Sequence, residues 1–147
     1  MKLLVTTTFT ALVKTLSLCF ILSAIAVSAF ANDVLGSGQL EPAFSSWGKA
    51  SVKGDWKIIK ADGKHYLELA DNFKAKSGPD VKIFLSPSKA SSITGDNATE
   101  GSVFIKLITN FEGKAQIELP ANIDISQYKS LVFHCEEYSK LWGVSAL

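Results

Sequence analysis

Residues 130–147 read SLVFHCEEYSKLWGVSAL, and the alternation in this stretch decides the fold class. Successive side chains of a strand point to opposite faces, so Leu131, Phe133 and Cys135 share one face. His134 belongs to the other face. An apolar face that alternates with a second face predicts a strand packed against a core, and we expect this stretch to close an all-β domain.

The same period of two recurs in short runs along the chain. Strands are predicted over residues 49–53, 56–60, 65–70, 81–86, 103–108, 115–119, 131–138 and 142–147, with 103–108 as a central strand. The clearest turn is at residues 61–64, where Asp-Gly tolerates the positive φ of a tight hairpin. About eight short strands with turns every ~8–12 residues predict a single antiparallel β-sandwich.

The segments between these strands are interpreted as connections. Residues 32–42 read as a polar lead-in, and Gly54-Asp55 as the junction of the first two strands. Residues 87–100 read as an exposed loop, and residues 122–128 as a connector with one helical turn. The predicted core consists of Leu67, Leu69, Val81, Ile83, Leu85, Val103, Ile105, Ile117, Leu119, Leu131 and Phe133.

Residues 1–31 have the pattern of a secretory signal peptide. Lys2 precedes an apolar run over residues 16–29, and the segment ends in Ala-Phe-Ala. A retained membrane anchor needs about 20 apolar residues, and no stop-transfer pattern follows. We expect cleavage after Ala31, which leaves one domain over residues 32–147 with no stable membrane span. The protein is then periplasmic or secreted, and the short leader favours the periplasm.

Charge and motifs exclude several function classes. Without Lys2 and Lys14, 13 lysines face 14 acidic residues, and the sequence contains no arginine. Nucleic-acid binding usually needs a basic patch, so we expect none. The chain also lacks G-x-S-x-G, a Ser-His-Asp set and a phosphate loop. We do not expect a stand-alone enzyme.

Cysteine use singles out one residue. Cleavage removes Cys19 and leaves Cys135 without an internal disulfide partner, although exported proteins normally pair their cysteines. Such a residue is an intermolecular partner, a reactive thiol, a ligand or an inert core residue. Leu131 and Phe133 make a dry wall beside it, which favours a ligand or a masked thiol over an exposed nucleophile.

The small number of cysteines and histidines also limits which metal or haem sites the chain could form. Structural zinc needs four Cys or His ligands, and after cleavage only Cys135, His65 and His134 remain, so no metal site is predicted. There is no C-x-x-C-H motif for covalent haem. A non-covalent haem or another prosthetic group held by Cys135 stays open, with His134 and Tyr138 as further candidates to line the site.

Residues 67–86, LELADNFKAKSGPDVKIFLS, resemble the central motif of the DM-thirteen domain family. In that motif a strand and an Asp-x-Phe turn lead through Gly-Pro-Asp into a second strand. Residues 36–38, 48–52 and 128–135 also fit the family pattern, so the resemblance covers essentially the whole chain after residue 31. Tyr138 is a mild departure, because the family often has Phe there.

The resemblance implies an electron-transfer domain of exported and cell-surface proteins, found in animals beside DOMON-type redox domains as in Skeletor-like proteins. It implies that Cys135 acts as a redox thiol or as the ligand of a prosthetic group such as haem. It also implies a redox partner protein in the same compartment. The Gly78-Pro79-Asp80 turn is expected to be structural and to carry no chemistry.

Two other interpretations stay open. The domain could be an extracytoplasmic binding or structural module in which Cys135 is a core residue, or a protein that stores or delivers metal. A visible absorption spectrum of protein from its native compartment separates a haem carrier from the rest. The sequon Asn97-Ala98-Thr99 matters only in a eukaryotic secretory route.

Cleavage after Ala31 predicts the start of the exported protein. N-terminal sequencing of that form should begin at Asn32, because signal peptidase cuts after a small-x-small pattern. An exported form that still begins at Met1 would contradict the prediction.

Overall fold

The fold is described by a computed structural model over residues 32–45, 48–49 and 52–147. The predicted leader, its cleavage site and Cys19 lie outside these residues. Within them, no helix is long and apolar enough to cross a membrane.

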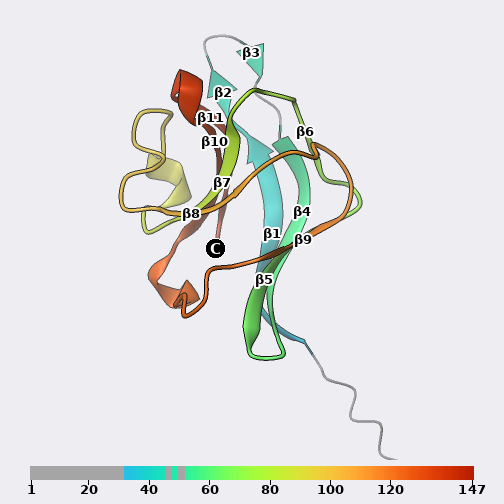
Figure 1. Cartoon of the computed structure of the whole chain (residues 1–147). Coiled ribbons are helices and arrows are strands. Elements are labelled where there is room, and N and C mark those ends of the chain that lie inside the picture. Colours follow the sequence, from blue (N-terminus) through green and yellow to red (C-terminus); the bar gives the residue numbers. More distant parts are fainter. Residues whose placement is uncertain (1–31, 46–47, 50–51) are drawn as a thin grey trace, which may run out of the picture.

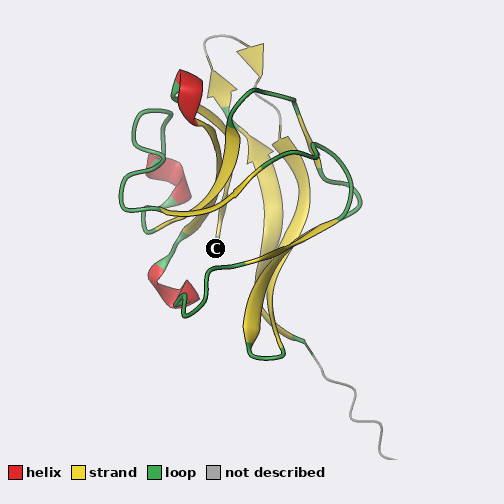
Figure 2. Cartoon of the chain, viewed as in Figure 1, coloured by secondary structure: helices red, strands yellow, loops and turns green. Residues whose placement is uncertain are grey.

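The described residues form an antiparallel all-β domain, which confirms the predicted fold class. Figure 2 shows strands and loops throughout, with three short turns of 3-10 helix. The strands are β1 (Asp33–Pro42), β2 (Phe44–Ser45), β3 (Gly48–Lys49), β4 (Val52–Ala61), β5 (Lys64–Leu69), β6 (Lys74–Ala75), β7 (Val81–Ser86), β8 (Val103–Leu107), β9 (Ala115–Glu118), β10 (Ser130–Cys135) and β11 (Lys140–Ala146). The 3-10 turns are η1 (Ala90–Ser92), η2 (Ile125–Gln127) and η3 (Glu136–Tyr138).

The sheet folds over on itself to make a barrel-like sandwich. Its strand order is β8-β7-β10-β11-β1-β4-β5-β9, with β6 paired to β4, and β2 and β3 form a small separate hairpin. Figure 1 shows β1, β4 and β5 in one layer and β7, β8, β10 and β11 in the other. The β4–β5 hairpin turns at Asp62 and Gly63, both with positive φ, as the Asp-Gly signal predicted.

The main core fills the space between the two layers. Eight of the predicted core residues are buried: Leu67, Leu69, Val81, Ile83, Leu85, Leu119, Leu131 and Phe133. The other three, Val103, Ile105 and Ile117, are partly buried and pack against this core. They lie on β8 and β9, the two edge strands of the described sheet. An edge strand has a neighbouring strand on one side only, so its side chains are less covered.

Residues 103–108 were predicted as a central strand, and this was wrong. In the described sheet β8 pairs with β7 alone, so it is an edge strand. Phe104 is 50% exposed and Leu107 is 40% exposed. A short apolar run reports high β-propensity, but it does not tell whether a strand has one neighbour or two.

Two connections predicted from turn residues are strand instead. The polar lead-in is β1, whose Gly38 leaves room for an indole ring: a Cβ there would lie 3.0 Å from Cζ2 of Trp56. Gly54 and Asp55 do not separate two strands but lie within β4. Gly54 has φ +124° and its missing Cβ would lie 2.6 Å from the Cα of Phe73, so glycine serves a close backbone approach.

The segment 87–100 is a loop, but part of it is buried rather than exposed. Ile93 and Ala98 pack with Phe84 and Val132 in a second apolar cluster. Phe84 alternates with the core residues Ile83 and Leu85 and points away from the main core, and this second cluster buries it. Figure 1 shows the loop outside the layer that contains β7 and β10. We call residues 87–102 the strap.

Removing side chains from the main core should be costly, because close packing leaves little room for relaxation. Ile83→Ala and Phe133→Ala should each lower the free energy of unfolding by roughly 2–5 kcal/mol. Both residues are fully buried.

Phe104→Ala on the exposed side of β8 is the matched control and should cost much less. Denaturant unfolding followed by circular dichroism measures all three. Equal losses for Phe104 and Phe133 would contradict the described core.

Candidate functional site

Cys135 lies at the end of β10, where the strand gives way to η3. It pairs with Val81 on β7 and with Lys140 on β11. Its side chain is fully buried in the main core, and it makes no disulfide in the described part of the chain. The thiol therefore lies at the last residue pairs of the ladder formed by β7, β10 and β11, inside the core.

The surroundings of Cys135 are apolar. The core cluster that contains it also holds Phe73, Phe133 and Trp142, and the rings of Phe73 and Phe133 lie 5.8 Å apart. The three cavities described below do not have Cys135 among their lining residues. None of these three cavities therefore offers a planar prosthetic group a place against the thiol, and the apolar packing around Cys135 suits a masked thiol.

His134 faces the other side of the sheet, as the alternation predicted. Its Nε2–H donates to the carbonyl oxygen of Gly95 in the strap, at 2.8 Å. Its ring meets Phe84 edge-on, with centroids 6.4 Å apart. The structure therefore does not bring His134 and Cys135 together at one ligand position.

The buried imidazole of His134 is held neutral. The residue is 3% exposed, and among the described residues its Nδ1 has no hydrogen-bond partner. Burial lowers the pKa of His134 below its usual 6.5, because a charged imidazole loses its hydration there. The Gly95 carbonyl and the carboxylates of Glu136 and Asp80 raise the pKa, but by less than burial lowers it. The Lys82 ammonium lowers it further.

Tyr138 sits at the surface end of the site, on η3, and is 53% exposed. The carboxylate of Glu137 raises the pKa of the Tyr138 phenol, through its charge and through a hydrogen bond. Cys135 makes a smaller contribution in the same direction. Tyr138 is the last residue of η3, three positions after Cys135. Tyr138 is thus the accessible neighbour of a buried cysteine.

Lys82, Asp80 and Glu136 form an ion cluster next to Cys135 that the sequence did not predict. The Lys82 ammonium is 3.1 Å from the Asp80 carboxylate and also pairs with Glu136. Both carboxylates raise the pKa of Lys82, Glu136 most strongly. Asp80 and Lys82 flank Val81 in the sequence, but only strand pairing places Val81 opposite Cys135, so no local pattern indicated the cluster.

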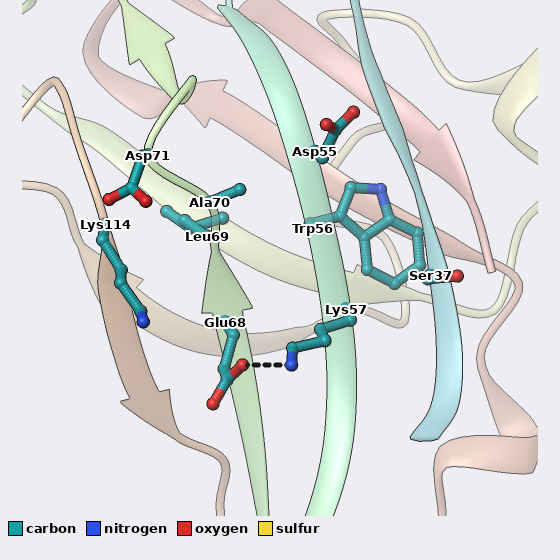
Figure 3. A pocket seen from close by; sticks show the side chains of 9 residues that line it. All are labelled: Ser37, Asp55, Trp56, Lys57, Glu68, Leu69, Ala70, Asp71 and Lys114. Carbon is teal, nitrogen blue, oxygen red and sulfur yellow. Dashed lines mark ion pairs between the residues drawn. The ribbon is translucent and has the colours of Figure 1, made fainter.

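Three cavities are described, all lined by residues other than Cys135, His134 and Tyr138. Figure 3 shows one of them, on β1, β4 and β5 and in the opposite layer from β10. Its volume is about 310 Å³.

The Glu68 carboxylate of this cavity is held by two side chains. The Lys57 ammonium lies 2.8 Å from it, and the Gln116 amide donates to the same carboxylate. Lys57 and Gln116 lower the pKa of Glu68 despite its partial burial, with help from the charge of Lys114. This fixed carboxylate is a structural anchor rather than an acid.

Metal-ligating side chains do not gather elsewhere in the part of the chain that the structure describes. Among residues 32–45, 48–49 and 52–147, no three His, Cys, Asp or Glu side chains form a group that could hold a metal ion. Asp55 and Asn72 instead bond each other through their side chains, at 2.9 Å. The metal-storage interpretation therefore has no ligand set in the described part of the chain.

Comparison with known families identifies the domain type. A family model described as Electron transfer DM13 matches residues 43–147, a range that contains Cys135 and every strand after β1. No curated protein and no solved structure matches the chain.

The neutral, buried His134 predicts a loss of stability in acid. Well above pH 6.5 the imidazole is neutral in both the folded and the unfolded chain. As the pH falls from 6.5 toward the lowered pKa of the folded state, the unfolded chain binds the proton more readily. The free energy of unfolding should therefore decrease over this window, and the change should be smaller in His134→Gln.

The control is His65→Gln, which changes the other histidine of the described residues, on β5. Urea unfolding at several pH values between 7 and 5 measures the effect. The same acid loss in His134→Gln and the unsubstituted protein, with His65→Gln unchanged, would contradict the role of His134.

Proposed function

The chain belongs to the DM13 family of electron-transfer domains, and we propose that Cys135 is its redox centre. The observation that carries the proposal is the position of this thiol. It is fully buried at the last rung of β10, next to an ion cluster and a surface tyrosine. A shielded thiol that lies one residue from an exposed turn can react when that turn opens.

The chemistry that suits a single thiol is exchange with a disulfide of a partner protein. The Cys135 thiolate attacks one sulfur of the partner's disulfide, a mixed disulfide forms, and the other sulfur leaves and takes up the proton. A second partner that carries two thiols completes the cycle: its first thiol attacks the Cys135 sulfur and releases the remaining thiol of the first partner, and its second thiol then closes a disulfide within the second partner and releases the Cys135 thiol. Two electrons pass between the proteins over such a cycle, and no second cysteine of this domain is needed.

The proposal includes export. The leader over residues 1–31 supports translocation, and an oxidising compartment supplies disulfide partners. The partner is then a protein of the periplasm or of the secretory route.

A second function is supported by the same burial. Cys135 belongs to the main core together with Val81 and Phe133, and a buried free cysteine often acts as a small apolar side chain. In that case the domain is a binding or structural sandwich whose thiol takes no part in activity.

Substitution of the thiol separates the two functions. Cys135→Ser and Cys135→Ala should both abolish electron exchange, because each removes the sulfur. The measurements are voltammetry of the adsorbed domain and formation of a mixed disulfide with oxidised glutathione, detected by mass spectrometry.

Val132→Ala is the control, because Val132 is buried on the same strand but on the other face. It should lower stability and leave electron exchange intact. If Cys135→Ala unfolds cooperatively and still exchanges electrons as the unsubstituted protein does, Cys135 is only a core residue.

A further inference from the structure

Lys82 bridges two segments that meet beside Cys135. Its ammonium lies 3.1 Å from Asp80, which precedes β7, and also pairs with Glu136, which follows β10. The side chains of Lys82, Asp80 and Glu136 are 23%, 29% and 39% exposed, so the cluster is only partly solvated. A partly buried network of three charges holds its geometry better than an isolated surface pair.

The backbone makes the same connection. The Glu136 N–H donates to the Asp80 carbonyl oxygen at 3.3 Å, one step beyond the last β7–β10 rung. That last rung is Val81 opposite Cys135. Because strand ends open more easily than strand centres, exposure of the thiol depends on whether this end of the ladder stays closed.

Trp142 on β11 also holds the segment that precedes Asp80. The Trp142 indole N–H donates to the Lys76 carbonyl oxygen at 2.8 Å. A Cβ on Gly78 would lie 2.9 Å from Val81 and 3.0 Å from the Trp142 ring, so the chain passes closely over both side chains. The Gly-Pro-Asp turn is thus packed against Val81, the cross-strand partner of Cys135, and against Trp142 of the same core cluster.

We propose that Lys82 is a positioning residue for the redox chemistry of Cys135: by holding Asp80 to Glu136 it keeps the last rung closed and the thiol masked. This inference rests on the proposed function and adds that Lys82 controls the access of a partner protein to Cys135. With the cluster closed, a partner's disulfide cannot reach the sulfur. Opening of the Lys82 contacts frees the Gly78–Asp80 turn and the start of η3, and the exchange described above can begin.

The test is the rate at which iodoacetamide alkylates Cys135 in the folded protein. Lys82→Met keeps the length of the side chain and removes its charge, so it should raise the rate roughly three- to tenfold. Exchange of the Glu136 amide hydrogen should accelerate in the same variant. Lys82→Arg should restore slow alkylation, because it keeps both ion pairs.

Lys57→Met is the matched control, because it removes the ion pair with Glu68 in the other layer. It should leave the alkylation rate unchanged. Raising the salt concentration to about 1 M shortens the screening length to about 3 Å, and should speed alkylation of the unsubstituted protein more than that of Lys82→Met.

The dependence of alkylation on denaturant separates local opening from global unfolding. Local opening predicts a rate that responds weakly to low urea, whereas alkylation through global unfolding follows the full dependence of the unfolding equilibrium. An unchanged rate in Lys82→Met, or a rate that rises only in step with global unfolding, overturns the inference. Neither result bears on electron exchange by Cys135, which the Cys135 variants test separately.

Discussion

The structure depends on β10 being buried from every side. This strand pairs with β7 along one edge and with β11 along the other, and all six of its residues are buried. One face contributes Leu131 and Phe133 to the main core, and the other places Val132 under the strap. A strand with both edges paired and both faces covered fixes the position of everything attached to it.

This burial gives the thiol and the imidazole of β10 different environments. Cys135 points into the main core, whereas His134 points into the second cluster and bonds Gly95. Gly95 itself lies so close to the Ser139 carbonyl that a Cβ would be 2.1 Å from it. The strap is thus anchored both to the strand that carries the thiol and to the turn that follows it.

The electron transfer that we propose for Cys135 requires a compromise between protection and access. Burial protects the sulfur from oxidation by small oxidants, because susceptibility follows exposure and thiolate character. Access then has to come from a segment of low local stability. The end of β10 combines these requirements: the thiol is in the core, and the next residue begins an exposed turn held by charges rather than by apolar packing.

Much of this arrangement was readable from local sequence. Period-two alternation predicted the sandwich, placed Cys135 inward and His134 outward, and Asp62-Gly63 marked a hairpin. Alternation reports only which face a side chain takes, because it arises from the geometry of a single strand. The order of strands, the edge position of β8, the packing of the strap residue Ile93 against Phe84 and Val132, and the contact of Lys82 with Glu136 were decided by the tertiary structure. Each of them depends on which distant segments pair, and no local pattern encodes that choice.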